Sequence, residues 1–155
     1  MPTRRSSPAP KRSLQYAAVP YRRNEDGETE VMLVTSRETR RWIVPKGWPI
    51  RGAKPHLSAA REALEEAGVV GETGPEPIGS YRYDKRLKNG TTARCLVEVF
   101  PLAVTGQRKR WREKGQREIR WFPLPEAARA VEETGLRRLL RQFDQLVPDD
   151  EPDED

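Results

Sequence analysis

The chain has 155 residues, of which 35% are hydrophobic and 34% charged, and its formal net charge is +5 at neutral pH. This length fits one domain with its own core, and no apolar run approaches the roughly 20 residues that a membrane-spanning helix requires. A single cysteine excludes an internal disulfide, and no apolar stretch follows the N-terminal arginines, which excludes a secretory signal. We therefore expect a cytoplasmic protein without a membrane segment.

The two ends of the chain differ from its body in composition. Residues 1–12 carry four basic residues among prolines and serines, and we expect a disordered basic tail. Residues 148–155 carry six acidic residues and predict a solvated acidic tail. Residues 13–147 then form one domain with 25 basic and 18 acidic residues, a formal charge of +7 that suits a polyanionic partner.

Apolar residues bounded by turn residues predict six strands. Pro20 should end the first strand or confine it to a sheet edge, because proline cannot donate a hydrogen bond to a ladder. The segments Asn24–Gly27 and Asn89-Gly90 are turn signals that join neighbouring strands. The predicted strands cover residues 14–21, 30–35, 41–45, 77–85, 91–104 and 118–122.

Three helices are predicted among and after these strands. The first begins near Pro55, a favourable first helical residue, and ends at Ala67, because Gly68 suits a left-handed cap. Its apolar face consists mainly of alanines, which would let the helix lie close against a sheet. Two more helices are predicted at residues 123–131 and 135–146. Strands and helices are therefore mixed along one α/β domain.

The first predicted helix carries three glutamates on one side. At about 100° per residue, Glu62, Glu65 and Glu66 fall within an arc of roughly 100°. Like charges this close repel and weaken a helix, whereas a hard divalent cation such as Mg²⁺ binds carboxylate and backbone carbonyl oxygens. The alternative interpretation is a solvated acidic helix face, which would suffice for an isolated pair of glutamates.

The segment from Gly47 to Val69 resembles the Nudix box, which reads Gly, five residues, Glu, seven residues, then Arg-Glu-apolar-x-Glu-Glu-x-Gly-apolar. The first glutamate of the box is Ala53 here, so Arg61 loses one partner and the rigidity of the loop is left open. The resemblance covers residues 14–146 and implies the Nudix fold, a mixed β-sheet sandwiched between α-helices. The positions that match are Gly47, Arg61, Glu62, Ala63, Glu65, Glu66, Gly68 and Val69.

Resemblance to this family implies a catalytic metal site for Mg²⁺, with Mn²⁺ as a possible substitute. By resemblance, Glu62 and Glu66 are metal ligands, and the backbone carbonyl of Lys46 is a further ligand. Glu65 is either another ligand or the acceptor of the attacking water's proton. Arg61 resembles the box arginine, which orients the carboxylates.

Many members of the family supply one further carboxylate from outside the box. Glu98, Glu113 and Glu118 are the candidates here, and each also has the simpler interpretation of an ordinary surface residue. We prefer Glu113, because it lies in a charged loop that could close over the site.

Residues 41–47 and 117–122 resemble the diphosphoinositol polyphosphate and diadenosine polyphosphate hydrolase branch of the family. That resemblance implies that Arg37, Gly47 and Arg117 contact the substrate, and arginine clusters favour polyanions because each guanidinium can bind phosphate through two hydrogen bonds.

The loop after Gly47 departs from the family. Its usual second glycine is Trp48 here, and Trp48-Pro49 makes the loop stiffer and bulkier, which could reshape the substrate pocket. Trp48 and Trp111 both lie in loops and are candidates for stacking on a base.

We interpret the chain as a Mg²⁺-dependent Nudix pyrophosphohydrolase of a small-molecule polyphosphate: a dinucleoside polyphosphate, an inositol pyrophosphate or another nucleoside diphosphate derivative. An RNA 5′ pyrophosphohydrolase is an alternative that the basic body permits, although the sequence shows no helix-turn-helix, zinc-ligand or RNP-type motif. A non-catalytic Nudix-fold binding or regulatory module is a second alternative, which the three intact glutamates argue against. The oligomeric state, monomer or homodimer, is left open.

Overall fold

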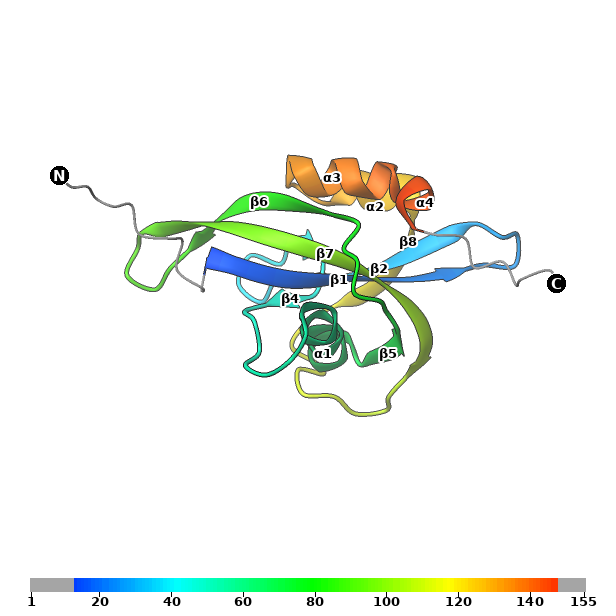
Figure 1. The fold of residues 1–155 in the computed structure, drawn as a ribbon, viewed down its shortest axis with the longest axis horizontal. Helices are drawn as coiled ribbons and strands as arrows, with labels where there is room; N and C mark the ends of the chain where they lie inside the picture. The colour runs from blue at the N-terminus through cyan, green and yellow to red at the C-terminus, as the bar shows by residue number, and fades with distance from the viewer. Residues whose placement is uncertain (1–12, 148–155) are drawn as a thin grey trace.

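One mixed sheet lies between two layers of helices in the computed structural model, which describes residues 13–147 (Figure 1). The predicted basic tail at 1–12 and acidic tail at 148–155 lie outside the described residues. The strands are β1 (Leu14–Arg23), β2 (Thr29–Thr35), β3 (Trp42–Ile43), β4 (Lys46–Gly47), β5 (Val69–Glu72), β6 (Gly79–Arg86), β7 (Thr92–Gln107) and β8 (Ile119–Pro123). The helices are α1 (Pro55–Ala67), α2 (Leu124–Ala130), α3 (Thr134–Arg141) and α4 (Phe143–Leu146).

The long strands β1 and β7 form the centre of the sheet. The hydrogen-bonded path runs β3-β2-β1-β7-β5, while β4 pairs with β1, β6 with β7, and β8 with β2. The β1–β7 pair is parallel, and the other pairs of these strands are antiparallel. The sheet is therefore mixed, and the predicted α/β fold with helices on both sides of a mixed sheet is confirmed.

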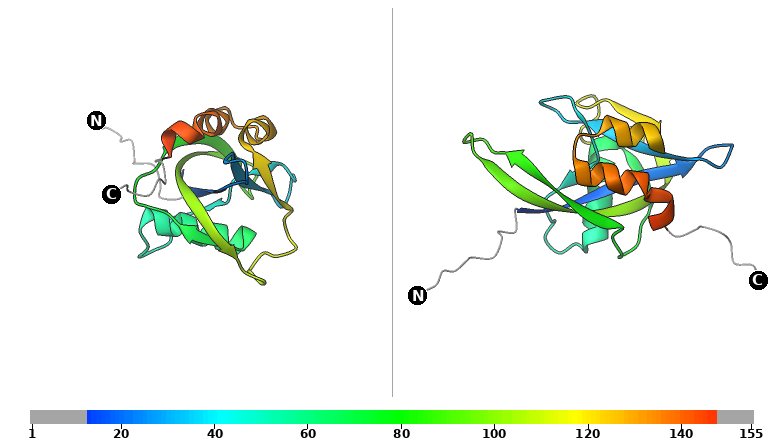
Figure 2. Two further views of the ribbon diagram at one scale, coloured as in Figure 1. Left: turned by 90° about the vertical axis from the view of Figure 1, so that its right-hand side faces the viewer. Right: turned by 90° about the horizontal axis from the view of Figure 1, so that it is seen from above.

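Helix α1 covers one face of the sheet, and α2, α3 and α4 cover the other (Figures 1 and 2). Ala59, Ala63 and Ala67 of α1 are fully buried, so the alanine face does let the helix lie close to the strands. On the opposite face, Leu136 and Leu140 of α3 are fully buried in a separate apolar cluster. Within the described residues, no helix has the length and apolar character to cross a bilayer.

Pro20 lies inside β1, so the prediction that it ends the strand or marks a sheet edge is wrong. One edge of β1 pairs with β7 along most of its length. The other edge pairs with β4 at Tyr16 and Ala17 and with β2 from Tyr21 to Arg23. Pro20 falls between these two short ladders, where a missing N–H leaves no strand partner unsatisfied.

Three further boundaries differ from the sequence-based expectation. Residues 69–72 form β5, which was not predicted, because the long strand β7 supplies an edge for four residues to pair with. A side chain on Gly71 would collide with the carbonyl of Ala103, so this strand needs glycine there. Of the predicted strand 41–45, only Trp42–Ile43 is a strand, β3, and Lys46–Gly47 just beyond the predicted range forms β4 with a different partner. The last predicted helix is interrupted at Gln142.

We expect Leu140→Ala to lower the free energy of unfolding by about 2–5 kcal/mol, because it leaves a cavity in a fully buried position. Urea denaturation measures this loss. Leu57→Ala is the matched control, since Leu57 is 51% exposed, and it should change stability by less than about 0.5 kcal/mol. Equal losses in the two variants would contradict the assigned core.

Candidate active site

Helix α1 presents its three glutamates at different depths. Glu66 is buried, with 5% of its surface exposed, while Glu62 and Glu65 are half-buried. Burial raises the pKa of Glu66, and burial together with repulsion from Glu65 raises the pKa of Glu62. Atom Oε1 of Glu66 is buried and has no hydrogen-bond partner among the described residues. A solvated acidic helix face therefore does not describe this arrangement.

The short strand β4 brings backbone against these carboxylates. A side chain at Gly47 would collide with the carboxylate of Glu62 unless that carboxylate turned away, so glycine permits this close approach. The neighbouring Lys46 directs its side chain toward Tyr83, with its Nζ atom 4.9 Å from the ring centroid. Burial lowers the pKa of Lys46, while the nearby charge of Glu66 opposes that shift.

The loop between β4 and α1 is held without the box glutamate that Ala53 replaces. The Ala53 N–H donates to the Ile50 carbonyl at 3.0 Å, which closes a turn. The Ile50 N–H in turn donates to Oγ of Ser58, a buried residue of α1, at 3.2 Å. Arg61 instead pairs with Glu65, at 3.5 Å between Nε and Oε2. The first turns of α1 thus supply support that the sequence analysis did not identify.

The segment between β7 and β8 packs across the C-terminal end of α1. The Arg108 N–H donates to the Gly68 carbonyl at 2.8 Å, and the Glu113 N–H donates to the Glu65 carbonyl at 2.9 Å. The ring of Trp111 occupies the space that a side chain on Gly68 would need. This packing makes Trp111 a structural contact of the loop and brings Glu113 beside the helix.

Arg117 joins the carboxylates of the loop and the helix. Its Nε atom lies 2.7 Å from Oε1 of Glu113, and its Nη2 atom lies 3.8 Å from Oε2 of Glu66. A third contact, from Nη1 to the carbonyl of Thr35 at 3.1 Å, fixes the guanidinium on β2. Arg37 lies at the outer side of this network, with Nη1 4.0 Å from Oε2 of Glu113. The structure therefore gathers the two predicted arginines around Glu66 and Glu113.

The other two candidate carboxylates are not part of this network. The Glu118 side chain is 55% exposed and pairs with Arg120 at 3.5 Å. Glu98 lies on β7 opposite Tyr16 of β1, where its charge adds to burial in raising the pKa of that tyrosine. Thr35 was missed by the sequence analysis, because a backbone carbonyl at the end of a strand leaves no signature in the sequence.

The donor set fits a hard divalent cation, although the side chains are not arranged around one. Within residues 13–147, no group of three or more His, Cys, Asp or Glu side chains is gathered as a ready ligand set. Arginines neutralise the carboxylates instead: Arg61 pairs with Glu65, and Arg117 pairs with Glu66 and Glu113. The unpartnered, buried Oε1 of Glu66 is the atom that lacks a counterpart, and carboxylate oxygens are the ligands that Mg²⁺ prefers.

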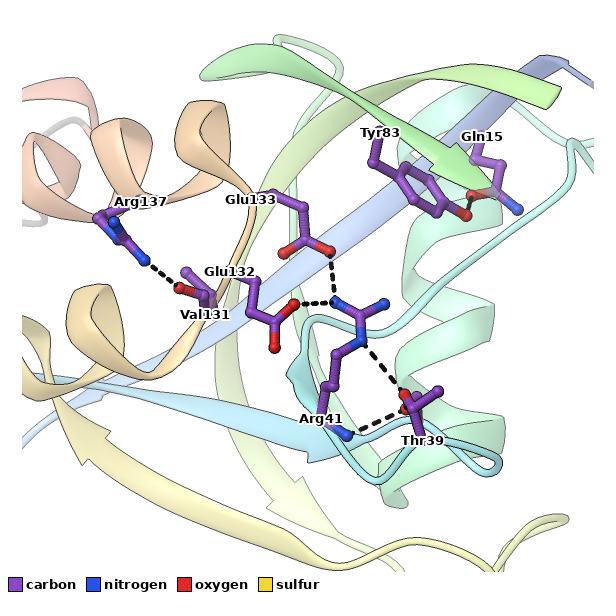
Figure 3. Close-up of polar contacts among 9 residues, drawn as sticks. Gln15, Thr39, Arg41, Tyr83, Val131, Glu132, Glu133 and Arg137 are labelled. Atoms are coloured by element: carbon purple, nitrogen blue, oxygen red, sulfur yellow. Dashed lines mark hydrogen bonds and ion pairs between the residues drawn. The ribbon is translucent and has the colours of Figure 1, made fainter. Parts of the chain in front are cut away.

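A second polar cluster ties the β3–β4 segment to the helices on the other face (Figure 3). Nη1 of Arg41 lies 3.3 Å from Glu132 and 3.4 Å from Glu133, just before α3. Across β7, the hydroxyl of Tyr83 on β6 donates to Oε1 of Gln15 on β1 at 2.7 Å. The Arg41 contacts hold the start of the segment that leads through β3 to β4, where Gly47 lies against Glu62.

Comparison with known proteins gives matches along nearly the whole chain. Residues 13–150 match the NUDIX domain. Nudix hydrolase 12, mitochondrial, from Arabidopsis thaliana is 30% identical over 154 residues, which cover 88% of this chain and 75% of that protein. Diphosphoinositol polyphosphate phosphohydrolase 3-alpha from Mus musculus is 34% identical over 108 residues, which cover 68% of this chain and 62% of that protein. A crystal structure of a C. elegans Ap4A hydrolase binary complex has a TM-score of 0.62 at 21% identity, covering 85% of this chain and 95% of that chain.

We expect Gly68→Ala to lower the free energy of unfolding more than Gly27→Ala does. Both glycines have a positive φ, which costs about 1–2 kcal/mol for a residue with a side chain, but only Gly68 also touches a neighbouring ring, that of Trp111. Urea denaturation gives the two losses, and hydrogen exchange should rise in residues 108–118 for Gly68→Ala alone. Equal losses with unchanged exchange would contradict the packing of this loop on α1.

Proposed function

The chain belongs to the Nudix family of hydrolases, and we propose that it is a Mg²⁺-dependent pyrophosphohydrolase of highly phosphorylated substrates. The proposed substrate is a dinucleoside polyphosphate, an inositol pyrophosphate or another nucleoside diphosphate derivative. The names of the murine relative and the C. elegans structure support the first two classes. The observation that carries the proposal is the buried carboxylate of Glu66, whose Oε1 is unpartnered beside Glu62 and Glu113.

In this proposal, Glu62, Glu66 and the backbone carbonyl of Lys46 hold the metal, with Mn²⁺ able to replace Mg²⁺. Glu113 is the further carboxylate, because Arg117 already holds it on the same side as Glu66. The bound cation would neutralise phosphate charge and lower the pKa of the attacking water. For Glu113 and Glu66 to turn toward a cation, Arg117 must give up part of its contact with them.

The same arginine then becomes available to the substrate. Arg117 and Arg37 bind phosphate oxygens in this proposal, and Arg37 is suited to that role because its side chain is 55% exposed. Gly47 lets the substrate and the carboxylate of Glu62 come close to the backbone. Glu65 is half-exposed, so it is placed either to bind the cation or to accept a proton from water.

The alternative functions raised by the sequence predict different experimental results. An RNA 5′ pyrophosphohydrolase would show salt-dependent RNA binding in a gel shift, whereas a small-molecule hydrolase would not. A binding module would cleave no phosphoanhydride in a panel assayed with Mg²⁺ or Mn²⁺. We propose a cytoplasmic location because Cys95, the one cysteine, is buried and forms no disulfide.

We expect Glu66→Gln to lower kcat/KM by at least about 100-fold on every cleaved substrate of a phosphoanhydride panel, because a neutral amide is a poor ligand for Mg²⁺. The variant should fold normally, since burial already disfavours the charged form of this side chain. Glu118→Gln is the matched control, and it should change kcat/KM less than twofold because Glu118 is exposed and outside the network. Full activity of Glu66→Gln would show that the metal-site proposal is wrong.

We expect Glu113→Gln to raise the Mg²⁺ concentration for half-maximal activity by about tenfold or more, as loss of a group that supports a metal typically does. Titration of Mg²⁺ at saturating substrate measures this shift. Glu98→Gln should leave the midpoint unchanged, because Glu98 lies beside Tyr16 instead. If Glu98→Gln moves the midpoint and Glu113→Gln does not, the further ligand has been assigned to the wrong residue.

A further inference from the structure

We propose that the hollow beside the β4–α1 loop binds a nucleobase of the substrate, stacked on Trp48. This inference rests on the proposed function for the phosphate part of the ligand, and it selects nucleotides over inositol phosphates among the proposed substrates. The hollow has a volume of about 590 Å³ and is lined by Leu14, Tyr16 and residues 48–52. That volume lies within the range of ordinary small-molecule sites, which are concave and largely apolar.

Aromatic side chains supply the surface that a base needs. Tyr16 comes from β1 and Trp48 from the loop, so the two rings belong to different elements on the same hollow. Every base has a flat π-face, and stacking on an aromatic side chain is therefore favourable for any of them. Trp48 is also the residue that replaces a glycine in the family pattern, so this chain differs from the pattern at the wall of the hollow.

Positive charge lies where the phosphate chain of such a ligand would leave the base. Arg51 lines the hollow, and Nζ of Lys85 lies 6.0 Å from the centroid of the Trp48 ring. Gly47, which touches Glu62, directly precedes Trp48 in the chain, so the hollow begins beside the proposed metal site. An apolar wall with cations at its margin is complementary to a base that carries phosphates.

The hollow at the other end of β1 does not have these properties. It has a volume of about 480 Å³ and is lined by residues of the β1–β2 hairpin, five of the six being charged. It carries no aromatic side chain and is separated from the loop by the length of β1. Of these two hollows, only the one that contains Trp48 offers an aromatic side chain on which a base can stack.

The proposal is tested by calorimetric titration of the full chain in EDTA, so that cleavage does not interfere. ATP and inorganic tripolyphosphate are the two probes, because they share a triphosphate and differ in the nucleoside. We expect ATP to bind at least about tenfold more tightly, the size typical of one stacked base. Equal affinities for the two probes would overturn the proposal without the use of any variant.

Variants then locate the stacking surface. Trp48→Leu should lose the preference for ATP, Trp48→Phe should keep most of it, and Tyr16→Leu should weaken it as the second wall. Trp121→Phe is the control, since the Trp121 ring contacts Arg22 at 4.1 Å and does not line the hollow. A folded Trp48→Leu variant with unchanged ATP affinity would overturn the proposal. The proposal would also be overturned if Trp48→Leu changed the oligomeric state of the protein and left the ATP affinity unchanged. That result would indicate that a second copy of the chain occupies the hollow.

Measurements of activity distinguish the nucleobase site from the proposed catalytic function. If no phosphoanhydride is cleaved but ATP binding depends on Trp48, the nucleobase site stands and the catalytic proposal fails. If dinucleoside polyphosphates are cleaved and Trp48→Leu leaves KM unchanged, the catalytic proposal stands and the nucleobase site fails. With both correct, Trp48→Leu should raise KM about tenfold for dinucleoside polyphosphates and leave KM for inositol pyrophosphates unchanged.

Discussion

The burial of Glu66 is the constraint on which the rest of the site depends. A carboxylate removed from water is unfavourable as an anion unless a cation lies close, and burial accordingly raises its pKa. Arg117 supplies a partner at 3.8 Å from one oxygen, and the other oxygen has no hydrogen-bond partner within residues 13–147. The helix thus holds a carboxyl group whose charged form the protein only partly stabilises, which is the arrangement expected where a bound cation completes the site.

Two glycines allow the elements around the site to pack closely. At Gly47 the absent side chain leaves room for the carboxylate of Glu62, and at Gly68 it leaves room for the ring of Trp111. The first contact sets backbone against the glutamate face of α1, and the second holds the β7–β8 segment across the end of α1. Glycine at both ends of the box is therefore explained by close approach, and Gly68 also has the left-handed conformation of a helix cap.

The two faces of the sheet carry different groups of residues. The α1 face carries the carboxylates, the loop that follows Gly47 and the hollow beside Trp48, whereas the opposite face carries the larger aliphatic core and the Arg41 cluster. Lys46 connects them, because it directly precedes Gly47, which lies against Glu62, while its half-buried side chain points toward Tyr83. The proposed metal site thus lies on α1, while the loop that precedes α1 forms the proposed contact with the part of the substrate beyond its phosphates.

The local sequence pattern was sufficient to predict α1, its first and last residues, and the shared face of its glutamates. Spacing along a helix determines which residues share a face. The local pattern was also sufficient to predict an α/β domain, whereas the mixed sheet between helices was implied by the resemblance to the Nudix family. Local pattern did not predict β5, which pairs with the edge of β7, or the place of Pro20 between two ladders. The sequence could name Glu113 and Arg117 as candidates without showing that they meet Glu66. Only the tertiary structure decided that, because hydrogen bonds to the carbonyls of Glu65 and Gly68 carry a distant loop onto the end of α1.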